Sequence, residues 1–433
     1  MEYTTIGSMR VSKVCAGSMT WGSFVDSEEE AHRQLDAYLR LGVNFIDTAE
    51  LYPVAWNYGK TTERWIGSWL KTRLDECAIK RGDIYIASKC NMAGVGGTGG
   101  GAHGYDTDIL RASCLASIER LQCSYIDLYY LHWPSRDTPL FGCSSFHPDG
   151  AHRATPFADR GEASAFEAQV LAVKALLDAG LIKHWGVSNE SGFGLTMFCV
   201  TADRLGVPRP AACENEYSLV NRSYEVDVWE AAYRFGVAGV PYGVLSGGTL
   251  TGKYAATAEP TGASAAAPAA AAEKSLAAAR HRQRPEFQPR YYSPLVLQAA
   301  ELYAELARRH GLTPTELALA WVRQRPCVAS VLLGTTTVQQ VEEGVAACAR
   351  ELPEAVLEAV EVLHERTRNP GVYLADKLAY HTAPWLAEDD DEQANGDAAS
   401  EGGSPAAKRA RRHESSSPLA AKEPGAAQAA GGR

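Results

Sequence analysis

Four side chains of the sequence, Asp47, Tyr52, Lys89 and His132, could together carry out acid–base chemistry on a carbonyl group. A tyrosine hydroxyl has an ordinary pKa of about 10, so it can protonate a carbonyl oxygen but releases its proton reluctantly. A buried lysine ammonium beside it stabilises the phenolate, and an aspartate keeps that ammonium charged. A histidine ring nitrogen can orient the same carbonyl oxygen. The combination predicts a general acid, Tyr52, surrounded by groups that tune it for carbonyl reduction.

Each of these residues also has a purely structural interpretation: a loop aromatic, two halves of an ion pair, and a hydrogen-bonded core histidine. Their positions favour the functional one. Asp47, Lys89 and His132 are the last residues of three consecutive strand-like segments separated by helical segments, and Tyr52 follows the first of them. In a parallel barrel the ends of consecutive strands meet on one face, which is where barrel enzymes have their active sites. We therefore expect the three strand-end residues to lie in one register.

Strand-like and helical segments alternate along most of the chain, and this order predicts an α/β fold, a (β/α)8 TIM barrel preceded by a β-hairpin around Gly7 and Ser8. A doubly wound sheet would explain fewer of the strand positions. The segment 27–41 opens with Ser-Glu-Glu-Glu, an N-cap serine followed by an acidic first turn. We expect strands at 14–17, 43–47, 84–89, 126–132, 183–190, 211–215, 237–243 and 330–334, and helices at 27–41, 61–74, 107–121, 162–179, 191–205, 223–235, 294–310, 313–323 and 338–347.

Composition divides the chain into a barrel and additional segments. We expect the barrel to occupy residues 1–370, followed by a short C-terminal extension at 371–385 and a disordered tail at 386–433 that is rich in acidic residues, Gly, Ser, Pro and Ala. Residues 94–104 and 255–289 are of low complexity, and both are predicted to be loop insertions.

The overall composition is that of a globular protein with a large core: 433 residues, 45% of them hydrophobic and 22% charged. The formal net charge of -10 argues against nucleic acid as the main partner, because phosphate binding requires a basic surface. No apolar stretch approaches the roughly 20 residues that span a bilayer, and the N-terminal segment lacks the pattern of a secretory signal. The ten cysteines are scattered singly, which is typical of reduced and mostly buried thiols. We therefore expect a cytoplasmic protein with no membrane partner.

Two glycine-rich stretches resemble phosphate-binding loops. Residues 94–99 fit G-x-G-x-x-G, but the next helical segment begins only near residue 107, so the context of a Rossmann fingerprint is missing. Residues 247–253, GGTLTGK, resemble a P-loop but continue with Tyr254 where Ser or Thr should bind Mg²⁺. A glycine-rich loop with one lysine after a barrel strand still suits a pyrophosphate that needs no metal.

Seven motifs in order along the chain, GVNFIDTAELY, IASK, LYYLHWP, HWGVSNE, YSLVNR, GGTLTGKY and SVLLGTTT, resemble the aldo-keto reductase family, in particular its bacterial Tas-type members. The resemblance covers roughly residues 1–370. It implies a (β/α)8 barrel that binds NADPH across its mouth without a Rossmann fold and transfers hydride to an aldehyde or ketone. It also implies that Asp47, Tyr52, Lys89 and His132 form a catalytic tetrad with Tyr52 as the proton donor, which agrees with the chemistry of these residue types.

The same resemblance implies a set of residues that bind NADP(H). Ser188 and Asn189 would hold the nicotinamide carboxamide, and Tyr242 would stack on the nicotinamide ring. Residues 245–253 would cover the pyrophosphate, and Arg290 would pair with the 2′-phosphate. The full set comprises Gly17, Ser18, Met19, Thr20, Asp47, Ser188, Asn189, Glu214, Tyr242, Gly243, Leu245, Gly247, Lys253, Arg290, Gly334, Thr335, Thr336 and Gln340.

Two positions depart from the family pattern. Glu214 stands where the family usually has Gln at the carboxamide, and Gly344 stands where an Asn often contacts adenine. A glutamate keeps an acceptor for the amide N–H₂ but loses a donor, so the preference between NADPH and NADH stays open. The expected partner is a small-molecule carbonyl substrate at a mouth that contains Trp21, Trp56 and Trp133; the substrate's identity and the oligomeric state stay open as well.

Two other functions fit parts of the sequence. The first is an NADP(H)-binding barrel that serves as a redox-sensing or regulatory subunit with little turnover, as some ion-channel-binding members of the family do; Glu214 and the unusual tail favour it. The second is a metal-dependent barrel hydrolase, which needs at least three ligands that converge on one ion. The sequence contains no second histidine on a neighbouring strand end near His132. We therefore expect no metal site.

A basic cluster, Lys408–Arg412, lies in the expected tail. It has three possible roles: a nuclear-import signal, a contact with nucleic acid, or a counter-charge to the acidic run 388–392. Acidic residues outnumber basic ones in this tail, so direct nucleic-acid binding is the weakest of the three.

Overall fold

The computed structural model describes residues 1–54, 61–91, 105, 107–136, 138–139, 162–254, 279–285 and 287–372. The chain divides into two compact units, Met1–Leu378 and Ala379–Arg433, and only the first contains described residues. Several features expected from the sequence lie wholly or largely outside the described residues: Trp56, the insertion at 94–104, residues 255–278 of the insertion at 255–289, residues 373–385 of the extension at 371–385, and the tail at 386–433 with its basic cluster Lys408–Arg412.

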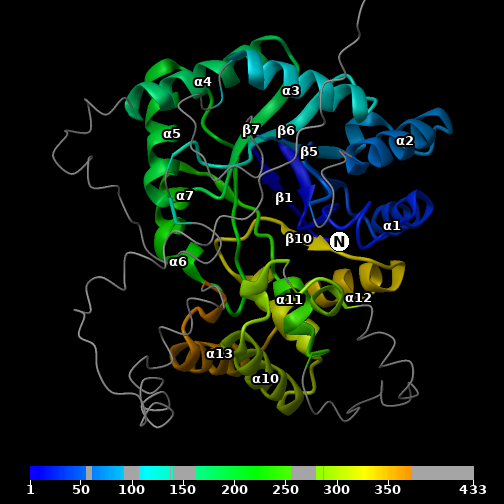
Figure 1. The fold of residues 1–433 in the computed structure, drawn as a ribbon, viewed down its shortest axis with the longest axis vertical. Coiled ribbons are helices and arrows are strands. Elements are labelled where there is room, and N and C mark those ends of the chain that lie inside the picture. Colours follow the sequence, from blue (N-terminus) through cyan, green and yellow to red (C-terminus); the bar gives the residue numbers. More distant parts are fainter. Residues whose placement is uncertain are drawn as a thin grey trace, which may run out of the picture. The chain divides into compact units, whose positions relative to one another are not determined.

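A barrel of eight parallel strands forms the centre of the first unit, with helices around it (Figure 1). The strands follow one another in the order β10-β3-β4-β5-β6-β7-β8-β9. Two backbone hydrogen bonds close the circle: Ala329 N donates to Gly239 O at 2.8 Å, and Leu332 N donates to Pro241 O at 3.0 Å. The predicted (β/α)8 fold is confirmed. The strands are β3 (Val14–Gly17), β4 (Phe45–Asp47), β5 (Tyr85–Cys90), β6 (Ile126–Leu131), β7 (Ile182–Ser188), β8 (Ala212–Glu214), β9 (Ala238–Gly239) and β10 (Val331–Gly334).

The predicted N-terminal hairpin consists of β1 (Tyr3–Ile6) and β2 (Met9–Ser12), paired antiparallel. Its apolar side chains Ile6, Met9 and Val11 pack into the core inside the barrel, together with inward-facing residues of the strands. At the turn of the hairpin, the hydroxyl of Ser8 lies 2.8 Å from Nε2 of His184, near the start of β7. The hairpin therefore covers the amino ends of the strands, and the opposite end, the mouth, carries the loops that follow the strands.

The helices agree closely with the pattern-based expectations. Ser27 caps α1 by accepting a hydrogen bond from Glu30 N, as its sequence predicts. The helix expected at 223–235 is divided in two at Val228. The helices are α1 (Glu28–Arg40), α2 (Thr61–Asp75), α3 (Thr107–Arg120), α4 (Glu162–Asp178), α5 (Gly192–Leu205), α6 (Ser223–Asp227), α7 (Trp229–Phe235), α9 (Arg280–Gln283), α10 (Pro294–Arg309), α11 (Pro314–Gln324), α12 (Val338–Cys348) and α13 (Glu354–Thr367).

Two helices were not expected from the sequence. The segment α13 has apolar residues Val356, Val360 and Leu363 at helical spacing, and these are the residues it buries, so the signal was present and was missed. The four residues of α9 lie in the stretch 255–289, for which a loop insertion was expected; that expectation is wrong for Arg280–Gln283. Such a short helix has no periodicity that a pattern search could find, and its surroundings are rich in alanine and proline.

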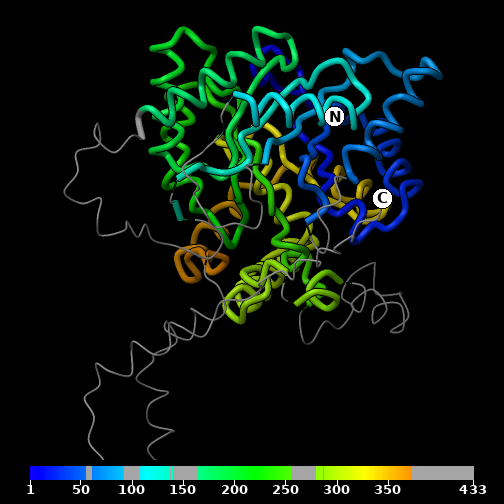
Figure 2. Tube along the Cα trace, turned by 45° about the horizontal axis from the view of Figure 1, so that its top comes forward, coloured from blue at the N-terminus to red at the C-terminus, as the bar shows by residue number. Residues whose placement is uncertain are grey.

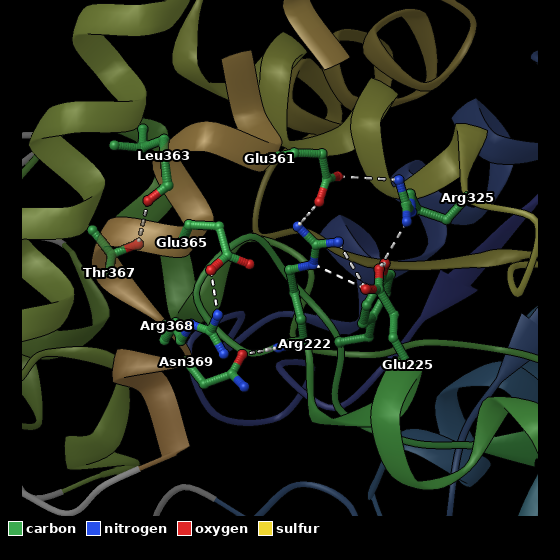
Figure 3. A network of polar contacts seen from close by, with 10 residues as sticks. Arg222, Glu225, Arg325, Glu361, Leu363, Glu365, Thr367, Arg368 and Asn369 are labelled. Carbon is green, nitrogen blue, oxygen red and sulfur yellow. Dashed lines mark hydrogen bonds and ion pairs between the residues drawn. The ribbon is translucent and has the colours of Figure 1, made fainter. Parts of the chain in front are cut away.

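An ion-pair network holds α13 against the rest of the barrel (Figure 3). The buried guanidinium of Arg222, just before α6, pairs with Glu225 at 2.7 Å and with Glu361 of α13 at 2.8 Å. Arg325 pairs with the same two carboxylates, at 3.3 Å each. The backbone N–H of Arg222 also donates to Oδ1 of Asn369 at 2.7 Å. This network joins the loop after β8 to α13. Helix α10 packs beside α13, as both views of the chain show (Figures 1 and 2).

The described helices include none that is both long enough and apolar enough to cross a membrane. The nine cysteines within the described ranges all have free thiols, and seven of them are buried. This agrees with the expectation of reduced, mostly buried thiols for that part of the chain.

Candidate active site

The four residues of the predicted tetrad come together at the mouth of the barrel. Lys89 Nζ donates to Oδ1 of Asp47 at 2.5 Å and to the carbonyl oxygen of Thr48 at 3.0 Å. The same ammonium lies 5.1 Å from the centre of the Tyr52 ring. That ring meets the imidazole of His132 edge to face, with centroids 5.8 Å apart. All four side chains are buried, so their interactions with one another are little screened by water.

The strand ends that carry these residues are not in one register, and that part of the sequence-based prediction is wrong. Asp47 pairs with Ala87, two residues before Lys89. Lys89 in turn pairs with Tyr130, two residues before His132, and His132 lies just beyond the end of β6. Strands in a closed barrel are tilted and staggered, so the pairing shifts from one strand to the next. The side chains still meet because the long Lys89 side chain bridges the stagger.

Burial and charge set the protonation states of the tetrad. Burial raises the pKa of Tyr52, and the nearby Lys89 ammonium only partly offsets this rise. Burial alone would lower the pKa of Lys89, but the carboxylates of Asp47 and Glu214 outweigh it and raise that pKa. Burial, followed by the charge of Lys89, lowers the pKa of His132 well below its usual range. At neutral pH the site therefore contains a protonated tyrosine, a charged lysine and a neutral imidazole, a set suited to donating a proton.

Glu50 and Asn91, which sequence reasoning missed, support the loops of Tyr52 and His132 together with Trp133. The backbone N–H of Asn91, just after β5, donates to Oε1 of Glu50 at 2.8 Å, and Oδ1 of Asn91 accepts from Nε1 of Trp133 at 3.1 Å. The indole of Trp133 stacks on the imidazole of His132, with centroids 4.7 Å apart and 15° between the planes. One asparagine thus connects the loop that carries Tyr52 with the aromatic pair beside it. Its position directly after a barrel strand was the available signal.

The residues expected at the nicotinamide lie next to the tetrad. Asn189, held at a φ of 60°, donates from Nδ2 to the carbonyl oxygen of His132 at 2.9 Å and to Ser188 Oγ at 3.0 Å. Its Oδ1 accepts from the hydroxyl of Tyr242 at 2.6 Å. Ser188 Oγ donates to the carbonyl oxygen of Glu214 at 2.8 Å. These contacts bring β7, β8 and the segment after β9 to the same edge of the tetrad.

Glu214 ends β8 with its side chain turned toward the tetrad. Its Oε1 lies 3.3 Å from Lys89 Nζ, so the ammonium contacts two carboxyl groups, those of Asp47 and Glu214. The sequence showed an acidic residue at this position but gave no indication that it shares the catalytic lysine. This contact is the main way in which the site differs from the one expected.

The glycine-rich segment after β9 has a backbone that few side chains would allow. Gly243, Gly247 and Gly248 all have positive φ values, of 69°, 64° and 98°. A Cβ on Gly247 would lie 2.7 Å from Nε2 of His281, so the loop is packed closely against α9. The predicted residues Leu245, Gly247 and Lys253 lie in or beside the short 3₁₀ helix Ser246–Thr251.

A second cation that the sequence did not reveal, Arg280, lies near Lys253 at this glycine loop. Burial, together with the charge of Arg280, lowers the pKa of Lys253, so two positive groups lie near each other there. Burial also lowers the pKa of Arg280. Arg290, expected at the 2′-phosphate, instead contacts Oε2 of Glu216 through Nε at 2.9 Å and the hydroxyl of Tyr291 through Nη2 at 3.1 Å. Its predicted phosphate contact stays a prediction.

The first barrel loop is joined to the end of β10. Gly17 pairs with both Asp47 and Gly334, and Thr20 Oγ1 donates to the carbonyl oxygen of Thr335 at 2.9 Å. The predicted cofactor residues Gly334 and Thr335 thus lie beside those of the first loop. Ser18 is buried and Met19 is half-buried in that loop, while Thr336 N donates to Oε1 of Gln340 at 2.9 Å.

The unusual Gly344 has a packing explanation. A Cβ at this position would lie 2.6 Å from a methyl group of Leu333, which is buried at the end of β10. A larger residue at position 344 would require Leu333 to move. In this chain the side chain of Leu333 therefore occupies the space beside position 344.

Comparison with known proteins agrees with this architecture. The model of the Aldo/keto reductase family matches residues 13–365. The chain is 36% identical over 370 residues to protein tas of Escherichia coli, which covers 84% of this chain and 98% of that protein. It is 28% identical over 362 residues to the uncharacterized oxidoreductase YrpG of Bacillus subtilis, a match that covers 82% of this chain and 94% of that protein. It is also 28% identical over 380 residues to a probable voltage-gated potassium channel subunit beta of Arabidopsis thaliana, a match that covers 86% of this chain and 100% of that protein. With its closed (β/α)8 barrel and the match over most of its length, the chain belongs to the aldo/keto reductase family.

Proposed function

We propose that this protein is an NADPH-dependent oxidoreductase that reduces an aldehyde or ketone to an alcohol. The observation that carries the proposal is the buried cluster in which Lys89 contacts Asp47 and lies against the ring of Tyr52, with a neutral His132 at the edge of that ring. The family membership and the oxidoreductase relative support the same general activity.

When bound, NADPH supplies the hydride that adds to the carbonyl carbon. The chain's own residues handle the proton. Tyr52 gives its hydroxyl proton to the carbonyl oxygen, and the Lys89 ammonium stabilises the resulting phenolate. His132, neutral at the working pH, orients the same oxygen by donating a hydrogen bond. Asp47 keeps Lys89 charged through its 2.5 Å contact.

The residues present at the mouth are suited to such a cofactor. Two polar atoms, Ser18 Oγ and His132 Nδ1, are buried there with no hydrogen-bond partner among the described residues, and they are available to a ligand. The glycine loop brings its backbone close to the space beside Lys253 and Arg280, two cations that suit phosphate groups. We assign Lys253 and Arg280 to the cofactor phosphates.

The proposal is tested with the purified chain, NADPH and a panel of aliphatic and aromatic aldehydes and ketones. We expect quenching of protein fluorescence on addition of NADPH and steady-state oxidation of NADPH with at least one carbonyl of the panel. Protein that neither binds NADPH nor oxidises it with any member of the panel contradicts the proposal. A parallel titration with NADH measures the preference between the two cofactors.

A second function is supported by the relatives named as probable potassium channel beta subunits. In this alternative the chain is an NADP(H)-binding regulatory subunit that senses redox state and turns over little. Slow oxidation of bound NADPH limited to one turnover, together with a stable protein partner, supports the alternative. Steady-state turnover of about 1 s⁻¹ or faster, ordinary for enzymes, excludes it.

A further inference from the structure

A buried ion pair joins the loops that follow β6 and β7 at the mouth of the barrel. Arg136, in the loop that begins with His132, binds the carboxylate of Glu190 with both ends of its guanidinium: Nη1 donates to Oε1 at 2.9 Å and Nη2 donates to Oε2 at 2.6 Å. The side chains of Arg136 and Glu190 are 15% and 2% exposed. A bidentate pair fixes both the distance and the relative orientation of its two partners, which a single contact between point charges does not do.

The same two loops meet at a second contact, beside the tetrad. Asn189, which precedes Glu190, donates from Nδ2 to the carbonyl oxygen of His132 at 2.9 Å. Its φ of 60° is a left-handed conformation that is uncommon outside glycine and that the surrounding contacts must hold in place. Asn215 binds both backbone polar groups of Glu190, the N–H at 3.2 Å and the carbonyl oxygen at 2.7 Å. The two contacts between the loops therefore close a ring that runs from His132 through Arg136 and Glu190 to Asn189 and back.

We propose that Arg136 is a positioning residue for carbonyl reduction and that it acts through His132. Its pair with Glu190 fixes Asn189, and the amide of Asn189 in turn fixes the backbone of His132. The imidazole is thereby kept at the edge of the Tyr52 ring. A displacement of about 1 Å in such a group can slow the chemical step about 100-fold. The inference rests on the function proposed above and adds one residue to the machinery of the same site.

The first turn of α5 packs directly on this ion pair. A Cβ on Gly194 would overlap Oε2 of Glu190 and Nη2 of Arg136. Both atoms are the ends of flexible side chains, so an alanine at this position would displace the pair while both charges remain. The rings of Phe166 and Phe193 lie 5.3 and 5.6 Å from the guanidinium carbon, which limits where the guanidinium can move. Position 194 therefore offers a test of the geometry of the pair that is separate from its charge.

The first test compares Gly194→Ala with the wild type in single-turnover oxidation of bound NADPH by a saturating carbonyl substrate, which isolates the chemical step from cofactor affinity and product release. Alanine favours the helical conformation more than glycine, so the helix itself is not weakened. We expect the rate to fall about 10- to 100-fold. Gly82→Ala is the matched control, because a Cβ there would meet nothing within 4 Å, and it should keep the wild-type rate. A wild-type rate in Gly194→Ala overturns the inference.

The second test removes the charges of the pair. Burial raises the pKa of Glu190 and the contacts of Arg136 oppose this rise, so removal of the guanidinium alone would leave a buried carboxylate without its partner. The variant is therefore Arg136→Ala/Glu190→Gln. Its control is Arg81→Ala/Asp127→Asn, a pair with 2.7 Å between Nη2 and Oδ2 that is 16% and 7% exposed and lies at the amino ends of β5 and β6. We expect both double variants to unfold at lower temperature and only the first to slow NADPH oxidation. Equal rates in the two double variants overturn the inference.

A double-mutant cycle distinguishes an effect through His132 from a general loosening of the mouth. If the pair acts through His132, adding Gly194→Ala to His132→Gln should lower the rate by no more than about twofold beyond His132→Gln alone. Losses that multiply overturn the inference. A wild type that oxidises no NADPH with any carbonyl contradicts the proposed function itself. An active wild type whose rate survives Gly194→Ala overturns only the role of Arg136.

Discussion

The ring of Tyr52 meets the ring of His132 edge to face, with 5.8 Å between the centroids and 76° between the planes. A carbonyl oxygen bound between these two side chains can receive a proton from one and a hydrogen bond from the other. The arrangement is held from behind, because Trp133 stacks on His132 and donates to Asn91, whose backbone N–H donates to Glu50 in the loop of Tyr52.

Removing the hydroxyl of Tyr52 should affect the chemical step and leave cofactor binding intact. We expect Tyr52→Phe to lower turnover by about two to four orders of magnitude, the usual contribution of a general acid. Steady-state oxidation of NADPH measures the first effect and fluorescence quenching the second. Tyr233→Phe, at a position that is 72% exposed, is the control and should change neither. Loss of NADPH binding in Tyr52→Phe would show that the residue has a different role.

Glu214 should make the protein without cofactor less stable as the pH rises. Burial and Asp47 raise the pKa of Glu214, so the folded chain binds more protons than the unfolded chain above the ordinary pKa of a glutamate. This proton contributes fully to the free energy of unfolding below the pKa of an unfolded glutamate. The contribution is lost as the pH rises from there to the raised pKa of Glu214 in the folded protein.

We therefore expect Glu214→Gln to gain stability relative to the wild type by on the order of 1 kcal/mol per pH unit between the ordinary pKa of a glutamate and the raised value. Thermal unfolding of both proteins from pH 5 to 9.5 measures this gain. The gain should grow with pH; a gain that shrinks as the pH rises would show that Glu214 is ionised in the folded protein.

The phosphate assignment predicts a defined loss of affinity in an Arg280 variant. The guanidinium lies near Lys253 at the glycine loop, where a phosphate would relieve the repulsion between the two cations. A hydrogen bond to a charged group contributes about 1.5–3 kcal/mol, so Arg280→Ala should weaken NADPH binding by about 10- to 100-fold. Arg282→Ala, at an exposed position of the same helix, is the matched control. Equal affinity of Arg280→Ala and Arg282→Ala for NADPH would refute the assignment.

His281 should contribute to unfolding in acid. Burial, followed by the charge of Arg280, lowers its pKa from 6.5 to about 4, so the unfolded chain binds the extra proton first as the pH falls. Neutral His281 contributes up to about 3 kcal/mol to the free energy of unfolding. This contribution is complete above pH 6.5 and is lost as the pH falls from 6.5 to about 4. His281→Phe, which can keep the stacking on Tyr292, should unfold less steeply in acid, whereas His310→Gln, at an exposed position, should behave like the wild type. Identical acid profiles for wild type and His281→Phe would contradict this account.

Local patterns predicted the barrel well. The strand Val14–Gly17 was predicted to the residue, and α1 begins after the serine that its sequence marked as the N-cap. Such features depend on a few neighbouring residues and are therefore visible in the sequence. The gathering of Asp47, Lys89 and His132 followed from their positions at or next to strand ends.

Features that depend on the whole sheet could not be predicted in this way. The stagger that pairs Asp47 with Ala87 arises from the tilt of all the strands in the closed barrel. The contact between Lys89 and Glu214 joins β5 to β8, which are not neighbours in the sheet. Arg280 was missed for a different reason: composition assigned its surroundings to a loop, and composition does not show where a short helix places a side chain.

The network around Arg222 determines where a probe could be attached without disturbing the site. Asn369 accepts a hydrogen bond from Arg222, and Gly371 N donates to the carbonyl oxygen of Val220 at 2.9 Å, so residues 369–372 lie beside the loop after β8, at the mouth. The exposed turn at Gly7 and Ser8 lies at the opposite end of the barrel. A fluorophore or surface anchor in that turn would lie away from the mouth, whereas one attached at Val372 would lie beside the loop after β8.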